Sequence, residues 1–368
     1  LSKIPILKKN DVRYRGKKLI ANNIPLSRVQ KDHTSGSTGE PITYLKDRYA
    51  LAEEKARLFR IWRWANSNPY QWSVLISSPK FKYIVPDTTI YINPTRIKED
   101  FEASIDRIRD IKPSIIRGGP LAIFEFARIM HEKNIIDISF SVAILYGHSL
   151  SEKVRNFIEN ALRCKAFNLY AMGEIGSIAA ECEFHSGLHI FEDNVIVEIV
   201  DRNGQVVKPG TRGKIIITDL TNYVMPFIRY DTGDMGMLLH RQCNCGRAMP
   251  LLIVDGREED MLVLPNDRLV FGGNARDCLD RYNAFVKRYQ LLQEDVNKFR
   301  MRVVRYPTYS ITTEKMIITD LKGLLGDSAN FSIEYCDDIP LEPSGKFKQL
   351  VSSVWEKRLL KYVEIGNN

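Results

Sequence analysis

The stretch SIIRGGPLAIFEFARIMHEK (residues 114–133) joins a short apolar run to a longer helix-like segment. The run SIIRGG is short and β-rich, as strands are, whereas Leu121–Lys133 has the periodicity of a helix. The same alternation recurs along the chain, in the strand-like run SVLISS (73–78) and in helix-like segments at Tyr49–Trp64, Lys98–Ile111 and Ser151–Leu162. Alternation of this kind predicts a large N-terminal α/β domain.

The pattern changes from about residue 187, where β-rich segments separated by turns replace the alternation. The segment VIVEIVDRNGQVVKPGTRGKIIITDL (195–220) predicts a hairpin with turns at Asn203-Gly204 and Pro209-Gly210. We therefore expect a β-rich subdomain within the large domain.

Beyond Asp260 the predicted elements follow a different order. They are a strand at Arg268–Phe271, a helix at Ala275–Tyr282, strands at Lys287–Leu292 and Lys298–Val304, a helix at Ser310–Leu325 and a strand at Phe331–Cys336. This β-α-β-β-α-β order predicts a small ferredoxin-like α+β domain at the C-terminus. The expected domains are residues 1–257 and 258–368, with a hinge near 257–260.

Composition narrows the class of protein. The chain has 368 residues and 44% hydrophobic content, which suffices for one large and one small domain with separate cores. It holds no run of about eighteen uncharged apolar residues, and its first residues are too charged for an export signal. We therefore expect no membrane partner and a cytoplasmic location. Because residue 1 is leucine, we also expect some N-terminal residues to be missing from this sequence.

The net charge of +8 is concentrated in residues 1–60, which hold fourteen lysines and arginines against six acidic residues. This stretch lacks the aromatic-interleaved or zinc-finger patterns of nucleic-acid proteins, so no nucleic acid is expected as a partner. It favours either a surface that attracts anions such as nucleotides or an ordinary solvated basic face.

The segment HTSGSTGEP (33–41) raises a question of charge. Its central residues are Ser35, Gly36, Ser37, Thr38 and Gly39. Such a backbone can turn tightly and aim several N–H and O–H donors at one point, as phosphate-binding loops do. A Walker-type loop would place a lysine next, but here Glu40 and Pro41 follow. The segment is either a phosphate loop whose cation comes from elsewhere or a flexible linker.

Four further motifs follow this loop in order, namely YAMGE (170–174), RYDTGD (229–234), GREED (256–260) and PSGK (343–346). With the segments IPILKKNDVR (4–13) and CEFHSGLHIFED (182–193), they resemble the adenylate-forming acyl-activating enzymes, and within them the phenylacetate-CoA ligase and CapK-like branch. The resemblance implies a two-step reaction. ATP and a carboxylic acid form an acyl-adenylate and pyrophosphate, and a thiol, usually that of coenzyme A, then takes the acyl group.

The residue chemistry suits the first step, because carboxylate attack on a phosphate needs donors, a metal ion and a cation. Glu174 suits a Mg²⁺ ligand, since Mg²⁺ takes one or two protein carboxylates, although a solvated loop glutamate is the alternative. Tyr170 offers a flat ring for adenine stacking, and Asn168 offers an amide for the base edge. A half-buried packing tyrosine is the alternative for Tyr170.

The other assignments lean on the resemblance. It implies that Asp234 binds the ribose hydroxyls and that Lys346 supplies the cation missing from the loop. Arg257 suits ribose or phosphate, or else a simple ion pair. The resemblance further implies that the small domain swings about the hinge, so that Lys346 moves in for adenylation and out for transfer.

The sequence departs from the family's pattern at three points. Gly173 stands where the Y-G-x-T-E motif has threonine, Glu259 stands at the hinge aspartate, and residues 261–271 lack the glycine-bearing loop that faces the thiol. The acceptor therefore stays open between coenzyme A, the phosphopantetheine of a carrier protein and an amine.

Two functions remain open at this point: an enzyme, and a degenerate relative that binds nucleotide or a partner protein without turnover. Retention of Glu174, Asp234 and Lys346 favours the enzyme. An aryl or medium-length acid is expected, in a pocket formed around Gly118-Gly119, Tyr146–His148 and Asn168–Met172. The oligomeric state is not predicted.

The cysteines carry a second signal. Cys182, His189, Cys243 and Cys245 offer three thiolates and an imidazole in β-rich text, a set that suits a closed structural Zn²⁺ site. Free surface thiols are the alternative, and His185 is the rival imidazole. The resemblance favours zinc, because related CapK-like proteins carry a similar set. The other cysteines, Cys164, Cys278 and Cys336, are expected to be buried thiols.

Overall fold

The computed structural model describes all residues except 2, 26, 28, 34–41, 69, 78–87, 148–149, 151, 202, 255–260, 266–267, 340–348, 356 and 359–368. The chain divides into two compact units, one formed by the described residues up to Val254 and the other by those from Met261 onward.

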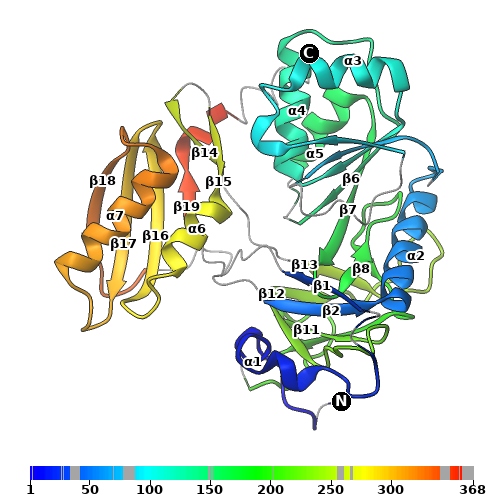
Figure 1. Ribbon diagram of the computed structural model, residues 1–368, viewed down its shortest axis with the longest axis horizontal. Coiled ribbons are helices and arrows are strands. Elements are labelled where there is room, and N and C mark those ends of the chain that lie inside the picture. Colours follow the sequence, from blue (N-terminus) through cyan, green and yellow to red (C-terminus); the bar gives the residue numbers. More distant parts are fainter. Residues whose placement is uncertain are drawn as a thin grey trace. The chain divides into compact units, whose positions relative to one another are not determined.

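An 11-stranded mixed sheet forms the framework of the first unit (Figure 1). Its strands lie in the order β10-β11-β12-β13-β9-β8-β7-β6-β5-β3-β4. The parallel half consists of β3 (Ser73–Ile76), β4 (Thr89–Ile92), β5 (Ile115–Gly118), β6 (Val142–Tyr146) and β7 (Lys165–Met172). Its helices are α2 (Arg48–Trp64), α3 (Phe101–Ile111), α4 (Pro120–Glu132) and α5 (Glu152–Leu162). The alternation predicted from the sequence is thus confirmed.

Helices cover both faces of this parallel half. On one face, Ile61 and Trp62 of α2 pack against Ile144 of β6 and Phe167 of β7. Helices α4 and α5 lie on the side away from α2 (Figure 1). Burial on both faces explains why these strands read as nearly continuous apolar runs.

The antiparallel half forms the expected β-rich subdomain. Its strands are β8 (Gly176–Ala180), β9 (Leu188–Ile190), β10 (Val195–Val200), β11 (Gly213–Asp219), β12 (Tyr230–Leu238) and β13 (Leu251–Val254). The predicted hairpin is confirmed, because β10 and β11 pair antiparallel with Val195 opposite Asp219. Gly204 and Gly210, in the predicted turns, both have positive φ angles, at 77° and 81°.

The N-terminal segment adds two short helices and a two-stranded ribbon. These are α1 (Lys9–Arg15), η1 (Gly16–Leu19), β1 (Val29–His33) and β2 (Thr43–Asp47). Asp47 ends β2 and caps α2, because its side chain accepts a hydrogen bond from the backbone N–H of Ala50 at 2.8 Å. This cap fixes the point at which the chain passes from ribbon to helix.

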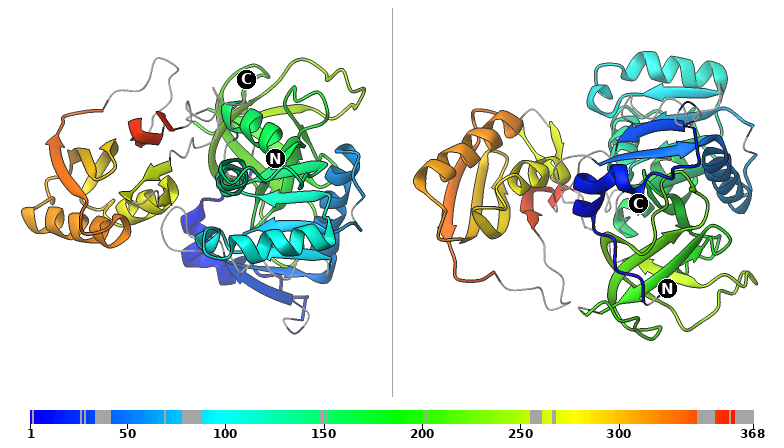
Figure 2. Two further views of the ribbon diagram at one scale, coloured as in Figure 1. Left: turned by 90° about the horizontal axis from the view of Figure 1, so that it is seen from above. Right: turned by 60° about the horizontal axis from the view of Figure 1, so that its bottom comes forward.

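The second unit has the predicted element order but a different sheet membership (Figure 2). Its elements are β14 (Met261–Val263), β15 (Leu269–Phe271), α6 (Gly272–Asp280), β16 (Val286–Asp295), β17 (Lys298–Arg305), α7 (Ile311–Leu325), β18 (Asn330–Tyr335) and β19 (Leu350–Ser352). The four-stranded sheet has the order β18-β17-β16-β19, whereas β15 pairs with β14. The ferredoxin-like arrangement is therefore not formed: β17 pairs directly with β18, and the late strand β19 pairs parallel with β16 at the other edge.

The core of this second unit lies between its two helices and one face of the sheet. Leu279 of α6 and Leu321 of α7 pack with Leu291 of β16 and Met301 of β17. The α/β fold class with a small α+β C-terminal unit is therefore confirmed. Among the described residues, no helix has the length and apolar character needed to cross a membrane.

Candidate functional site

Two of the motifs predicted to bind the nucleotide meet at the carboxyl end of β7. The hydroxyl of Tyr170 in β7 donates a hydrogen bond to the carboxylate of Asp234 in β12, at 2.8 Å. Both side chains are half-buried. Burial, together with the neighbouring charge of Asp234, raises the pKa of Tyr170 well above its usual value, so the phenol stays a donor. The fold thus brings the Tyr170 ring and the Asp234 carboxylate into contact, although they are 64 residues apart in sequence.

Glu174 lies in the turn that joins β7 to β8. It is only 2% exposed, and its Oε1 accepts a hydrogen bond from the Tyr230 hydroxyl at 2.8 Å. Burial and the charge of Glu174 raise the pKa of Tyr230, which keeps the phenol protonated. Among the described contacts this hydrogen bond engages Oε1, which leaves Oε2 as an oxygen donor for a cation.

The turn carrying Glu174 is held from behind by a buried ion pair. Lys46 of β2 lies 2.9 Å from Glu54 of α2, with 7% and 11% of their side chains exposed. The same ammonium donates to the Gly173 carbonyl at 2.7 Å. Lys46 therefore fixes the peptide immediately before Glu174.

A second cation holds the other side of this turn. Arg57 of α2 donates to the carbonyls of Ser177 at 3.0 Å and Ile175 at 3.4 Å. Burial lowers the pKa of Arg57, while Asp219 and Glu54 act in the opposite direction. The α2 helix thus orients the turn in two ways: Arg57 contacts the turn directly, and Glu54 pairs with Lys46, which holds the Gly173 carbonyl.

Asn168 lies on β7 two residues before Tyr170, so both side chains lie on one face of the sheet. Its backbone N–H donates to Glu181 at 2.8 Å, and Glu181 also accepts two hydrogen bonds from Arg155, at 2.7 and 2.9 Å. The rival imidazole His185 lies 3.1 Å from the same carboxylate. His185 therefore belongs to this network.

The four candidate zinc ligands lie together. The ligand atoms of Cys182, His189, Cys243 and Cys245 are all within 4.8 Å of one another. The Sγ atoms of Cys182 and Cys243 are 3.5 Å apart, and Sγ of Cys245 is 3.4 Å from Nε2 of His189. These residues come from the end of β8, from β9 and from the β12–β13 connection.

The donor set suits a divalent metal. Cys182 and His189 are fully buried, and burial lowers the pKa of His189, which favours the neutral imidazole that ligates metals. Burial raises the pKa of Cys182 to about 12 without a metal, so a thiolate there calls for a compensating cation. Three soft sulfur donors and one imidazole match Zn²⁺ chemistry.

The other predicted nucleotide-site residues cannot be placed. Ser35, Gly36, Ser37, Thr38, Gly39, Arg257 and Lys346 lie outside the described residues, as does the predicted hinge.

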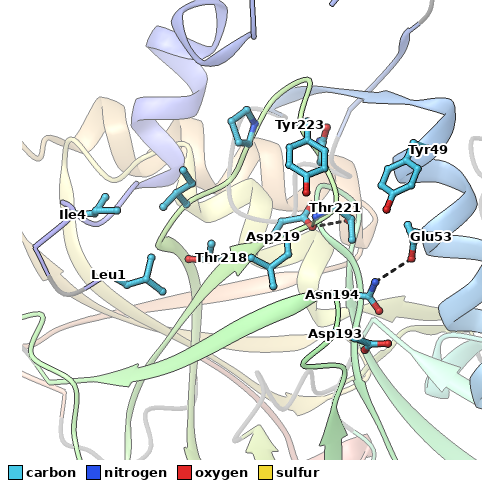
Figure 3. A pocket seen from close by; sticks show the side chains of 14 residues that line it. Leu1, Ile4, Tyr49, Glu53, Asp193, Asn194, Thr218, Asp219, Thr221 and Tyr223 are labelled. Carbon is cyan, nitrogen blue, oxygen red and sulfur yellow. Dashed lines mark hydrogen bonds between the residues drawn. The ribbon is translucent and has the colours of Figure 1, made fainter.

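A pocket of about 780 Å³ opens elsewhere in the first unit (Figure 3). Tyr49 and Tyr223 face across it, and Asn194 donates to Glu53 at 3.1 Å on its wall. Burial raises the pKa of Asp219, which also lines it. None of the predicted site residues is among those that line this pocket. This pocket is therefore distinct from the residues predicted to bind the nucleotide.

Parts of the chain match known proteins. The CapK C-terminal domain family matches residues 262–353. The phenylacetate-coenzyme A ligase of Thermus thermophilus is 31% identical over 173 residues, which are 44% of this chain and 38% of that enzyme. Protein CapK of Staphylococcus aureus is 22% identical over 375 residues, covering 96% of this chain and 80% of that protein.

The chain is thus similar to phenylacetate-coenzyme A ligases in part of its length and to a CapK protein over nearly all of it, and its C-terminal part matches the CapK C-terminal domain. Its fold also resembles that of 2-hydroxyisobutyryl-CoA ligase solved with 2-HIB-AMP and CoA, at a TM-score of 0.65 and 17% identity over 99% of this chain and 83% of that one. The part matched to the Thermus ligase is well under half of that enzyme's length.

The structure shows what occupies the space beside Gly173, where the similar Y-G-x-T-E motif has threonine. A Cβ atom at Gly173 would lie 3.0 Å from the hydroxyl of Tyr44, which is itself only 3% exposed. The phenol of Tyr44 therefore occupies the space beside the motif. The glycine and the tyrosine are complementary in size.

Sequence reasoning missed the residues that hold the Glu174 turn. Tyr230 stands inside a motif that was recognised for Asp234. Lys46 carries no local signal, because its partners Glu54 and Gly173 are 8 and 127 residues away. Only strand and helix packing brings these groups together.

Proposed function

We propose that this protein activates a carboxylic acid with ATP, forming an acyl-adenylate and pyrophosphate, and then transfers the acyl group to a thiol such as that of coenzyme A. The observation that carries the proposal is the hydrogen bond between Tyr170 and Asp234 beside the buried Glu174 turn. This arrangement brings together an aromatic ring (Tyr170), a carboxylate that can accept hydrogen bonds from ribose (Asp234) and a carboxylate that can bind a metal ion (Glu174). The similarity to phenylacetate-coenzyme A ligases supports the same reaction class.

Each residue has a defined task in the proposed first step. Tyr170 stacks on the adenine, and Asp234 accepts hydrogen bonds from the ribose hydroxyls while holding the Tyr170 phenol in place. Glu174 presents its free oxygen to Mg²⁺, which when bound neutralises phosphate charge. Tyr230 and Lys46 orient that carboxylate and its turn.

The loop at 34–41 and Lys346 complete the proposed charge balance. The loop supplies N–H and O–H donors to the phosphates, and the lysine adds a positive charge where negative charge develops in the transition state. Arg257 would assist at ribose or phosphate. This answers the question of the missing Walker lysine with a residue from the second unit.

We take the thiol of coenzyme A as the first candidate for the acyl acceptor. A carrier protein and an amine are the competing acceptors. Incubating the enzyme with acid, ATP and each acceptor in turn, and identifying the acylated product by mass spectrometry, separates the three.

We also propose that the Cys182, His189, Cys243 and Cys245 cluster holds one structural Zn²⁺. Four protein ligands fill a tetrahedral shell and leave no position for a reacting water. The ion would join three strand ends of the antiparallel half, and its role is to stabilise the fold.

The test of the proposed function is ATP–pyrophosphate exchange with a panel of aryl and medium-length acids in the presence of Mg²⁺. We expect exchange with at least one acid, and a loss of about a hundredfold or more in Glu174→Gln. Glu183→Gln is the matched control, because the exposed Glu183 pairs with half-buried Arg247 away from this turn. Folded protein that binds no ATP and exchanges with no acid would instead favour a degenerate relative.

A further inference from the structure

Arg57 of α2 lies directly against the turn that carries Glu174. The residue is only 2% exposed, and its guanidinium donates to the carbonyls of Ile175 and Ser177, on either side of Gly176. A Cβ atom at Gly176 would lie 3.3 Å from Nη2 of Arg57, and the φ angle there is +86°. Glycine suits both this backbone conformation and this close approach. The position of Arg57 therefore fixes the peptide units that directly follow Glu174.

A polar segment after β11 also contacts the guanidinium. Thr221 is 4% exposed, and its Oγ1 lies 3.5 Å from Nη2 of Arg57. The same hydroxyl donates to Oδ1 of Asp219 at 2.7 Å, and the Thr221 backbone N–H donates to that oxygen at 2.9 Å (Figure 3). Because the hydroxyl proton is donated to Asp219, the hydroxyl oxygen accepts from Arg57. The three residues therefore form one directed chain of hydrogen bonds.

The charges at the two ends of this chain are complementary. Asp219 is 6% exposed, and burial raises the pKa of its carboxyl, whereas the hydrogen bonds from Thr221 and the charge of Arg57 lower that pKa. A buried guanidinium and a buried carboxylate that are joined through one hydroxyl compensate part of each other's desolvation. Removing the hydroxyl would leave both charges buried but no longer linked.

The same segment supports Lys46, the other cation that holds the turn. The side-chain amide of Asn222, which is 2% exposed, donates to the carbonyl of Leu45 at 2.9 Å. Leu45 precedes Lys46 in β2, and Lys46 donates to the Gly173 carbonyl. Residues 219–222 thus contact both elements that hold the turn, namely α2 and β2.

We propose that Arg57, Thr221 and Asp219 are positioning residues for Glu174, so that binding of a cation by this carboxylate depends on the hydrogen-bond chain behind its turn. This inference rests on the proposed function, in which Glu174 presents an oxygen to Mg²⁺. Groups that orient a metal ligand from a second layer typically change metal affinity or activity by about ten- to a hundredfold when they are removed. The expected defect is therefore in the use of the metal, with binding of the acid unchanged.

Thr221→Val tests the chain, because it removes the hydroxyl and nearly keeps the size of the side chain. In ATP–pyrophosphate exchange we expect the Mg²⁺ concentration for half-maximal rate to rise by at least about tenfold, with KM for the acid unchanged. Thr221→Ser keeps the hydroxyl and should behave like wild type. Thr89→Val is the matched control, because the Thr89 hydroxyl also accepts from a buried arginine, Arg117, but lies on β4 at the far edge of the sheet.

Binding of Mn²⁺ gives a readout that does not depend on turnover. Mn²⁺ takes the same oxygen ligands as Mg²⁺, and its binding to the protein in the presence of ATP is measured by electron paramagnetic resonance. The dissociation constant should rise by at least about tenfold in Thr221→Val and stay at the wild-type value in Thr221→Ser and Thr89→Val. A purely structural hydroxyl would lower the melting temperature on removal and leave this constant unchanged, which would overturn the inference.

Arg57→Lys supplies a second, independent variant. It keeps a buried positive charge but loses the planar fork that spans two carbonyls. We expect Mn²⁺ binding to weaken as in Thr221→Val, and the double variant to weaken it by less than the product of the two single effects. Fully multiplicative effects would show that the two residues act separately, and would overturn the proposed chain.

The outcomes separate this inference from the proposed function. Wild-type protein that binds Mn²⁺ with ATP but exchanges with no acid overturns the function, and Mn²⁺ binding by the variants then still decides the inference. Wild-type protein that binds no Mn²⁺ in the presence of ATP overturns both. An equal change in Thr89→Val and Thr221→Val overturns the inference alone.

Discussion

Buried charge at single residues decides how the Glu174 turn is held. Lys46 and Glu54 form a pair that is almost removed from water, and Lys46 also binds the Gly173 carbonyl. Charges in such a setting stabilise only as a complete set, because each partner compensates the desolvation of the other.

Lys46→Met should therefore be strongly destabilising. It leaves Glu54 buried without its counterion, and we expect the free energy of unfolding to fall by about 3–5 kcal/mol in urea titrations. Arg96→Met is the control, since Arg96 pairs with Glu99 and Asp100 at the surface and should cost under about 1 kcal/mol. Equal losses in the two variants would contradict this account of the turn.

The pairing of Gly173 with Tyr44 makes a second prediction for single residues. Gly173→Thr adds a Cβ only 3.0 Å from the Tyr44 hydroxyl, which we expect to cost about 1–3 kcal/mol of stability. Tyr44→Phe removes the nearest atom, so the double variant should lose less than the sum of the two single losses. Strict additivity in thermal or urea unfolding would show that the two positions do not interact.

Among the elements, the Cys/His cluster lies where three segments of the antiparallel half meet. It joins the end of β8, β9 and the β12–β13 connection, segments separated by up to 63 residues between Cys182 and Cys245. These strands are short, with three residues in β9 and four in β13. Short strands have few ladder hydrogen bonds, so a metal there would contribute much of their stability.

Protein purified without chelator should contain about one Zn²⁺ per chain, measured by elemental analysis. Cys243→Ser should lose the metal and melt at a clearly lower temperature, because a structural ion contributes its binding free energy to folding. Cys336→Ser, which changes a half-buried cysteine outside the cluster, should keep the metal. Zinc-free wild-type protein would rule out the proposed site.

At the scale of the whole molecule, the proposed chemistry needs residues from both units. The first unit holds Tyr170, Glu174 and Asp234, while Lys346 belongs to the second. The two half-reactions should therefore depend differently on that lysine.

Lys346→Ala should lose adenylation by roughly a hundredfold or more, about 3 kcal/mol of transition-state stabilisation, whereas ATP binding weakens far less. Transfer from a chemically supplied acyl-adenylate should survive, because that step needs no extra cation at the phosphate. Exchange and single-turnover transfer assays on the same preparation measure both steps. Adenylation near the wild-type rate would place the cation elsewhere and remove the main support for a moving second unit.

Local patterns in the sequence determined the element order, the fold class and the motifs. Strand and helix periodicity depends on residues only a few positions apart. The alternation of strands and helices from β3 to β7 and the β10–β11 hairpin could therefore be predicted from the sequence. The prediction that β15 belongs to the four-stranded sheet was wrong, because strand partnership is a long-range property: β15 pairs with β14, and β19 joins the four-stranded sheet. Motif order also sufficed to indicate Tyr170, Glu174 and Asp234 as a group.

Only the tertiary structure decided which side chains share a buried space. It brought His189, and not His185, to the cysteines, placed Lys46 behind Gly173, and filled the space beside that glycine with Tyr44. The physical reason is that the energy of a buried charge or a close contact depends on neighbours in space, and strand pairing selects those neighbours from positions far apart in the chain.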